Sequence, residues 1–316
     1  MGVLIALLIG AQDPPVRHSF TIIEENDFFA QVSASDRHYS QGLRLEYHFF
    51  DVRTGPLFTL ASIYGEKRLY SNGVAIGQAM YTPEIITADP PDPLDRPYAA
   101  WLYVGFLTTV TDVDRRWQDT WEWDFGTVGP HALGDEIQSG WHAIIGADNP
   151  TWAKQLPNEI AGGLAWKRQW SHEAFGESTS DWGARTITSV GLTAGTVTCD
   201  ASVGAKFLFG YRVPDDFEAG RGTRGFPAGE GFRCYGFAGV EGRVVPWNLF
   251  LDGTVFRESA SVTRKYVTAD FSAGLVMRLG EGLGLSYAQV FRTGEIETDP
   301  RYHNFGSIVL TLSFPF

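Results

Sequence analysis

Apolar and polar side chains alternate along several segments of this chain, each about ten residues long or longer. A period of two places successive side chains on opposite faces of a β-strand. In the segment 43–49, one face carries Leu43, Leu45, Tyr47 and Phe49, and the other carries Arg44, Glu46 and His48. The segments 267–279 and 308–316 repeat the pattern. Together with 36 Gly and 44 Phe, Tyr and Trp (22, 12 and 10), this alternation predicts an all-β fold.

Two all-β architectures produce this alternation. In a soluble sandwich the apolar face lines the core, whereas in an outer-membrane barrel it contacts lipid and the polar face lines the lumen. The length of the segments favours the barrel, because soluble strands average about five or six residues. No apolar run approaches the roughly 20 residues of a membrane-spanning helix. We therefore expect a closed antiparallel transmembrane β-barrel in the outer membrane of a Gram-negative bacterium.

A pass along the chain predicts about twelve strands in a single domain covering residues 12–316, and an even number is typical of single-chain bacterial barrels. The segments are 18–32, 39–50, 72–82, 99–110, 118–128, 160–171, 182–197, 201–211, 231–251, 266–279, 283–293 and 302–316. With both chain ends in the periplasm, the connections 33–38, 83–98, 129–159, 252–265 and 294–301 face outside. Aromatic residues such as Trp101, Tyr103 and Tyr287 are expected at the membrane interfaces.

The two ends of the chain carry targeting features. Residues 1–11 are expected to be a signal peptide remnant, because the apolar run Val3–Ile9 is followed by small residues, although a basic region before it is missing. At the other end, Phe316 closes an amphipathic strand that resembles the signal read by the outer-membrane assembly machinery. That machinery is therefore an expected partner during biogenesis.

Charge and cysteine placement add two expectations. The formal net charge of -12 excludes a sequence-independent nucleic-acid binder, which needs a basic surface. Cys199 and Cys234 fall near opposite rims of the predicted barrel, and a disulfide requires Cα atoms within about 7 Å. We expect two free thiols. A bridge is the alternative if the topology is shifted by one hairpin.

The longest predicted outside connection, 129–159, contains a short helix that Asp135 is expected to cap and Gly146 to end. Gln138 and His142 are four residues apart, so they share a face of this helix. Another side carries Ile137, Trp141, Ile144 and Ile145, which would rest on the barrel rim or in the lipid headgroup layer. A lone histidine on a short helix is more often structural than catalytic, so its partners decide its role.

Candidate partners lie at the junction of the first two strands, where Asn26 and Asp27 end one strand and Ser40 begins the next. If these strands pair, Asp27 and Ser40 lie near the same rim as His142. Asp at the end of a strand usually serves only to form a turn, because its side chain bonds to the nearby backbone. Carboxylate, amide and backbone carbonyl oxygens are, however, the ligands that Ca²⁺ prefers.

An ordered set of motifs resembles the outer-membrane lipid A 3'-O-deacylase family over nearly the whole mature chain. The motifs are Glu25–Phe28, Asp36–Gly42, Met80–Pro83, Asp95–Trp101, Val128–Pro130, Gln138–Gly146, Phe237–Arg243 and Asn248–Gly253. The resemblance implies a twelve-stranded barrel that removes the 3'-linked acyloxyacyl group from lipid A, the membrane anchor of lipopolysaccharide, in a Ca²⁺-dependent reaction. The chain departs from the family pattern in two places. Some family members have Lys and Arg in the loop that corresponds to residues 83–98, where this chain has only Arg96, and Asp148 stands where Glu can occur.

By this resemblance His142 is the general base that takes a proton from water, Asp27 and Asn26 hold the metal, and Ser40 lies against the site. A neutral imidazole can accept that proton, and a divalent cation stabilises an oxyanion. Gln138 is a candidate oxyanion donor and Asp148 a candidate for orienting His142.

Two alternatives remain open. In one, Ser40 is the nucleophile and His142 its base, as in barrel phospholipases. In the other, the barrel is a non-enzymatic channel or adhesin whose lumen is filled by Arg44, Glu46, His48, Glu122, Asp124, Asp270 and Arg278.

Overall fold

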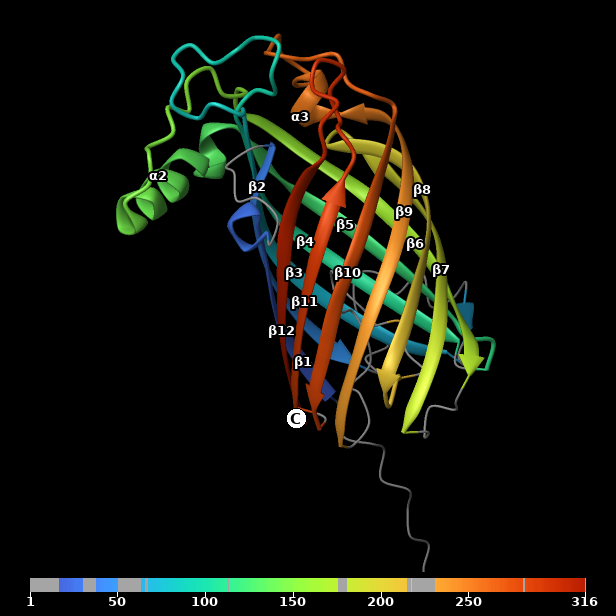
Figure 1. Ribbon diagram of the computed structural model, residues 1–316. Helices are drawn as coiled ribbons and strands as arrows, with labels where there is room; N and C mark the ends of the chain where they lie inside the picture. The colour runs from blue at the N-terminus through green and yellow to red at the C-terminus, as the bar shows by residue number, and fades with distance from the viewer. Residues whose placement is uncertain are drawn as a thin grey trace, which may run out of the picture.

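The computed structural model describes residues 17–30, 38–50, 64–65, 68–112, 114–175, 181–214, 217, 231–280 and 282–315. Twelve antiparallel strands form a closed barrel in which β1 pairs with β12 (Figure 1). The predicted architecture is confirmed, and each predicted segment overlaps one strand. The predicted segment 231–251 is wrong at its end, because a helix begins at Leu249. The expected signal peptide remnant lies outside the described residues.

The strands are β1 (Arg17–Asn26), β2 (His38–Phe50), β3 (Leu69–Thr82), β4 (Ala99–Asp112), β5 (Trp117–Val128), β6 (Glu159–Phe175), β7 (Trp182–Gly195), β8 (Thr198–Tyr211), β9 (Phe232–Asn248), β10 (Val267–Leu279), β11 (Leu283–Arg292) and β12 (His303–Pro315). The short helical elements are η1 (Asp27–Phe29), η2 (Pro130–Ala132), α2 (Gly134–Ile145) and α3 (Leu249–Asp252). In the described ranges, no helix is long and apolar enough to cross a membrane.

Both α2 and α3 lie at one end of the barrel, which we call the α2 rim (Figure 1). The described ends of the chain, Arg17 and Pro315, pair with each other at the opposite end. Cys199 lies at the start of β8, near the α2 rim, and Cys234 pairs with Tyr211 toward the opposite rim. Both cysteines are free, as expected.

The alternation along the strands separates an apolar outer wall from a polar lumen. On β3 and β4 the exposed positions are apolar and include Val74, Ile76 and Phe106. In contrast, Glu46 on β2 and Glu122 on β5 are buried inside the barrel. This arrangement is the one expected for a barrel in lipid, because lipid contacts the apolar wall while the lumen holds the charges.

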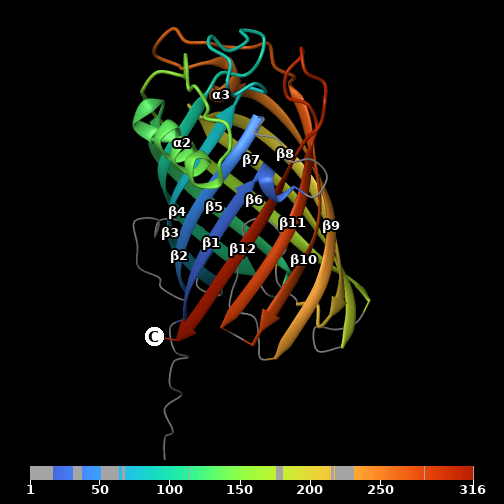
Figure 2. The same ribbon diagram turned by 60° about the vertical axis from the view of Figure 1, so that its left-hand side comes forward.

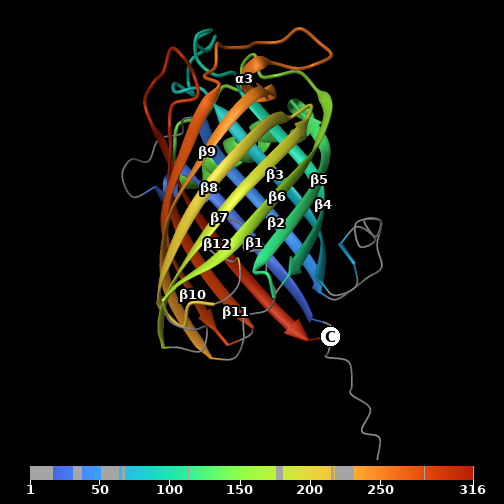
Figure 3. The ribbon, with the colours of Figure 1, turned by 90° about the vertical axis from the view of Figure 1, so that its right-hand side faces the viewer.

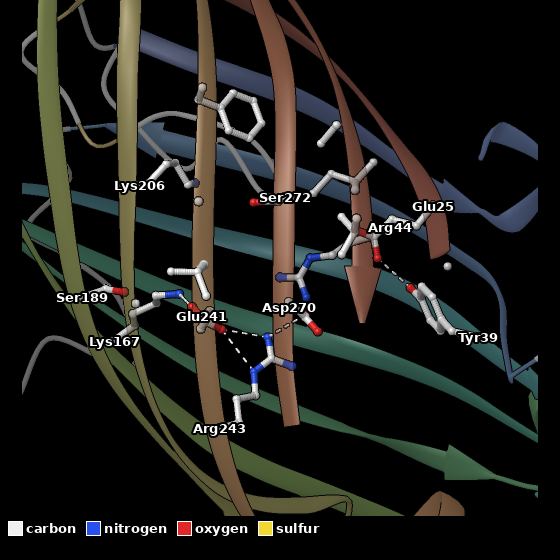
Figure 4. Close-up of a pocket in the computed structure, with 18 of the residues that line it drawn as sticks. Glu25, Tyr39, Arg44, Lys167, Ser189, Lys206, Glu241, Arg243, Asp270 and Ser272 are labelled. Carbon is white, nitrogen blue, oxygen red and sulfur yellow. Dashed lines mark hydrogen bonds and ion pairs between the residues drawn. The ribbon is translucent and has the colours of Figure 1, made fainter. Parts of the chain in front are cut away.

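Ion pairs link the charges of the lumen. Arg44 donates from Nε to Glu46 Oε1 and pairs through Nη1 with Glu122 Oε1, each at 2.6 Å. Figure 4 shows a second group around a cavity of ≈ 380 Å³, in which Lys167 and Arg243 both bind Glu241. Because these charges are paired across strands, they hold the wall together from inside.

The helix α3 lies at the α2 rim (Figure 3), and its residues Leu249, Phe250 and Leu251 are buried. Asn248 starts this helix by accepting a hydrogen bond from Phe250 N at 3.0 Å. The Phe250 ring stacks on Tyr81, with 4.2 Å between centroids, and packs against Leu156 and Val197. A packed apolar cluster at this end of the lumen does not favour the channel alternative.

Two expected interface aromatics occupy the lumen instead. The Trp101 ring stacks on Tyr103, with 4.3 Å between centroids, and Tyr103 accepts a hydrogen bond from Arg44 at 3.0 Å. The expectation that both residues lie at the membrane interface is therefore wrong. The physical reason is that α3 places Phe250 inside the rim, where it needs aromatic partners on the inner face of β3 and β4.

Candidate functional site

A row of paired residues crosses five strands just below the α2 rim. In order across the wall, the row is Gly306, Asn26, Gln41, Met80 and Ala100. Directly paired residues point to the same face of a sheet, and neighbouring strands lie about 4.8 Å apart. Met80 and Ala100 have the same parity on their strands as the exposed Ile76 and Phe106. The row therefore lies on the outer face of the wall, outside the lumen.

The turn η1 places Asp27 against this outer face. Asn26 Oδ1 accepts a hydrogen bond from Phe28 N at 2.8 Å, which ends the strand and starts the turn. The predicted first strand, 18–32, is therefore wrong at residues 27–30, and its residues 31–32 lie outside the described ranges. The Tyr287 hydroxyl donates to the Phe29 carbonyl oxygen at 2.9 Å and fixes the other end of η1. The Asp27 side chain is buried as a result.

Ser40 lies one strand away. The pairing of β2 with β3 shifts between Tyr39 and Gln41, so Ser40 sits in a bulge beside the row. Its hydroxyl lies 2.6 Å from the Thr82 hydroxyl, and both side chains are buried. Thr82 was not a predicted site residue, although the motif Met80–Pro83 contains it. Its place in that motif was the signal that could have found it, whereas its contact with Ser40 depends on the pairing of β2 with β3.

The helix α2 packs on the same outer face over β4. Its buried residues, Gly134, Gln138 and His142, are spaced four apart, which confirms that Gln138 and His142 share a face. A Cβ atom at Gly134 would lie 2.6 Å from the Cβ of Ala100, so only glycine allows this approach. Figure 2 shows α2 and the blue turn after β1 on the same side of the barrel.

The two ends of α2 differ in how well the sequence predicted them. Gly146 ends the helix with a left-handed φ of 72°, as expected. The predicted start is wrong: Leu133, and not Asp135, takes the N-cap position, and it makes no side-chain hydrogen bond there. Pro130 begins η2, which leads directly into α2 and moves Asp135 into the first turn. There Asp135 accepts a hydrogen bond from Ser139 Oγ at 2.8 Å.

His142 is held in one tautomer by the main chain. Its Nδ1 lies 2.5 Å from the backbone carbonyl oxygen of Asp148. A carbonyl oxygen only accepts, so Nδ1 carries the hydrogen, and Nε2 of the neutral ring carries the basic lone pair. Asp148, the residue expected to orient His142, contacts the imidazole through its backbone carbonyl oxygen and not through its carboxylate. The exchange of Glu for Asp therefore leaves this contact unchanged.

Gln138 is held by Trp152, whose Nε1 donates to Gln138 Oε1 at 2.9 Å. This contact turns the amide nitrogen, which carries two N–H donors, away from Trp152. Trp152 itself packs in a buried cluster with Met80, Ala100 and Tyr98, so it ties α2 to the wall. Burial raises the pKa of Tyr98, whose hydroxyl donates to Ile86 O at 2.6 Å.

The predicted site residues thus form two groups on one face. Asn26, Asp27 and Ser40 belong to the neighbouring strands β1 and β2 and the turn between them. Gln138, His142 and Asp148 belong to α2 and the segment after it, which lie over β4. Two strand spacings separate β2 from β4 and three separate β1 from β4, roughly 10 Å and 14 Å along the wall. Side chains and a lipid substrate can bridge such a span.

The side chains expected to hold Ca²⁺ carry oxygen donors, which is the kind of ligand a hard cation takes. Within the described ranges, no group of three or more His, Cys, Asp or Glu residues could hold a metal ion. The oxygens of Asp27, Asn26, Ser40 and Thr82 are nevertheless carboxylate, amide and hydroxyl donors of the kind Ca²⁺ takes. A single carboxylate fits a weak site completed by carbonyl, water or substrate oxygens.

Arg96, the basic residue of the loop 83–98, binds a carboxylate in the interior of the protein. It is fully buried, and its Nη2 donates to Glu295 Oε2 at 2.8 Å. Burial alone would raise the pKa of Glu295, but the positive charges of Arg96 and Arg292 outweigh it and lower this pKa to about 2. Arg96 therefore joins two loops of the α2 rim, and its guanidinium is not presented to a lipid phosphate.

Comparison with known proteins decides the family. The family model described as outer membrane protein LpxR matches residues 1–314. This chain belongs to the LpxR family. It is accordingly an outer-membrane protein, as its apolar wall indicates. The structure of LpxR from Salmonella typhimurium is similar, with 21% sequence identity and a TM-score of 0.74, covering 93% of this chain and 99% of that one.

A weaker likeness is to the β domain of the Bordetella autotransporter BrkA, which is 13% identical with a TM-score of 0.49, covering 96% of this chain and 100% of that one. It carries no functional argument. No curated protein sequence matches this member of the LpxR family.

Proposed function

We propose that this LpxR-family protein is a lipid A 3'-O-deacylase that hydrolyses the 3'-linked acyloxyacyl ester in the outer leaflet. Family membership supports a lipid A deacylase kind of function. The observation that supports the finer proposal is the contact of His142 Nδ1 with the Asp148 carbonyl oxygen, which assigns the hydrogen to Nδ1 and the basic lone pair to Nε2, on a helix that packs against the lipid-facing wall. A site there meets its substrate from within the membrane.

The chemistry follows from the held tautomer. His142 Nε2 accepts a proton from water as the water oxygen attacks the ester carbonyl carbon. An N–H of the Gln138 amide donates to the oxyanion that develops on the carbonyl oxygen. The bond from the carbonyl carbon to the 3'-oxygen then breaks, and His142 returns the proton to that oxygen. The products are a free acyloxyacyl acid and a 3'-hydroxyl on lipid A.

Asp27 and Asn26 would hold Ca²⁺, with Ser40 and Thr82 adding hydroxyl oxygens. When bound, the ion supplies positive charge that stabilises the developing oxyanion. Asp27 supplies the carboxylate, and η1 fixes its position.

The proposal is tested by mass spectrometry of lipid A from Gram-negative cells that express the protein, beside cells that express His142→Ala. We expect the wild type to lower the mass of lipid A by one acyloxyacyl group and the variant to leave the mass unchanged. Intact lipid A in cells with folded wild-type protein and ample Ca²⁺ would contradict the proposal.

Removal of calcium is expected to abolish the activity. Treating the purified protein with a chelator should stop hydrolysis, and added Ca²⁺ should restore it. Asp27→Asn should raise the Ca²⁺ concentration that gives half-maximal rate, because the variant loses the charged ligand. The rate is measured against free Ca²⁺ concentration. Full activity in the chelator would argue against a metal-dependent reaction.

Ser40→Ala is expected to keep measurable hydrolysis, because water is the proposed nucleophile and the Ser40 hydroxyl is bonded to Thr82. The alternative with a serine nucleophile predicts complete loss. Mass spectrometry of the intact wild-type protein during turnover separates them further. An acyl group attached to Ser40 would establish the serine route and exclude ours.

Gly306→Ala is expected to displace η1 and slow hydrolysis by about 10²-fold, the cost of a misplacement near 1 Å. A Cβ atom at Gly306 would lie 2.6 Å from both the Cβ and the carbonyl oxygen of Phe29. Gly242→Ala is the matched control, since nothing lies within 4 Å of its added Cβ. Initial rates of the two folded variants make the comparison. Equal rates would show that η1 is not part of the site.

A further inference from the structure

The helix α2 has three distinct faces. Successive residues are rotated by about 100°, so the buried stripe of Gly134, Gln138 and His142 separates two different flanks. One flank carries Ile137, Trp141 and Ile144, and Ile145 follows at the C-terminal end of the helix; we call these four residues the apolar flank. The other carries Asp135, Glu136, Ser139 and Ala143.

The apolar flank is open in the protein itself. Ile144 is 78% exposed, and the other three members are also classed among the exposed large hydrophobic residues. Four such side chains on one helix flank form a patch that water solvates poorly. Since α2 already contacts the wall through its buried stripe, this flank is left for a different partner.

The wall beneath α2 indicates that partner. Ala100 lies under the start of α2, and Leu102 follows two residues further along β4. Leu102 pairs with Thr127 on β5, and Thr127 pairs with Ile160 on β6, so these three residues point to the same outer face. Ile160 is 66% exposed on the outer face, where lipid contacts the barrel. On the other side of the site, Phe28 of η1 is 64% exposed. The lipid-facing surface of the barrel therefore reaches the level of α2 from both sides.

We infer that α2 lies in the plane of the bilayer boundary, with its apolar flank inserted among the lipid acyl chains and its acidic flank toward water. The partner is the bilayer itself. A helix with one apolar and one polar flank and an aromatic residue at the boundary suits that position. The buried stripe anchors it to the wall between these two environments. This inference does not depend on the proposed activity.

Spin labels on adjacent residues test the insertion. In a full-length background with Cys199→Ser and Cys234→Ser, a nitroxide is attached at Ile144→Cys or at the control Ala143→Cys. Both positions are exposed, so labelling leaves the packing of α2 intact. The labelled proteins are placed in phosphatidylcholine vesicles. Collisions with apolar oxygen and with a water-soluble nickel chelate are then measured.

We expect the ratio of oxygen to nickel collisions to be several-fold higher at position 144 than at position 143. Equal, water-like ratios at both positions would overturn the inference. Low collision rates with both reagents at position 144, together with a cross-linked dimer, would also overturn it, because a second copy would then cover the flank.

Discussion

Replacing His142 with alanine is expected to lower the rate of lipid A ester hydrolysis by about 10²–10⁴-fold, the usual contribution of a positioned general base. The reason is the basic lone pair on Nε2, which the hydrogen bond from Nδ1 to the Asp148 carbonyl oxygen sets in place. The measurement is the initial rate on purified lipopolysaccharide at saturating Ca²⁺. Binding of substrate should change far less than turnover.

His131→Ala is the matched control for this variant, because His131 is an exposed histidine in the same connection between β5 and β6. It should retain the full rate. If both variants keep wild-type activity while folded, His142 is not the base. If both lose activity equally, the loss reflects the connection as a whole, and the assignment to His142 is likewise contradicted.

Replacing Arg44 with methionine is expected to destabilise the barrel by about 3–5 kcal/mol, the range found when one partner of a buried ion pair is removed. Arg44 pairs with Glu46 and Glu122, and both carboxylates are buried in the lumen. Without the guanidinium, two negative charges would face each other away from water. Reversible urea unfolding in detergent micelles, followed by tryptophan fluorescence, measures the change.

Arg115→Met serves as its control. The Arg115 side chain is 76% exposed, and its Nε lies 3.9 Å from Asp112 Oδ2. The Arg115 guanidinium lies in water, and Asp112 keeps its ion pair with Arg68 at 2.9 Å, so we expect a loss of about 1 kcal/mol or less. The unfolding free energies of the two variants should therefore differ clearly. Similar small losses in both would show that the lumen charges do not stabilise the wall.

Alternation was the part of the sequence that determined the fold. It placed Arg44, Glu46 and Glu122 on one face and Leu43 and Leu45 on the other, and strand length then assigned the charged face to the lumen. The same logic failed where local contacts outweigh periodicity. Nothing in the alternation shows that the Asn26 side chain closes β1 by accepting from Phe28 N, or that Leu133 precedes α2.

The candidate site was harder to predict, because it depends on register between strands. Asn26 and Asp27 were identified with His142 through motif resemblance, but their outer-wall position required the pairing of Asn26 with Gly306 and Gln41. Thr82 and Trp152 lie in this region through contacts between strands and loops, and no sequence spacing reports those contacts. Trp101 was misplaced for the same reason, since its partner Phe250 is distant in sequence.

The most direct measurement for the central claim is the position of Ca²⁺ in crystals of the protein grown with that ion. Our account predicts an ion on the outer wall between η1 and α2, about 2.3–2.6 Å from a carboxylate oxygen of Asp27 and on the side that His142 faces. An ion held by the lumen carboxylates, or a structure in which Asp27 and His142 lie on different sides of the barrel, would contradict it.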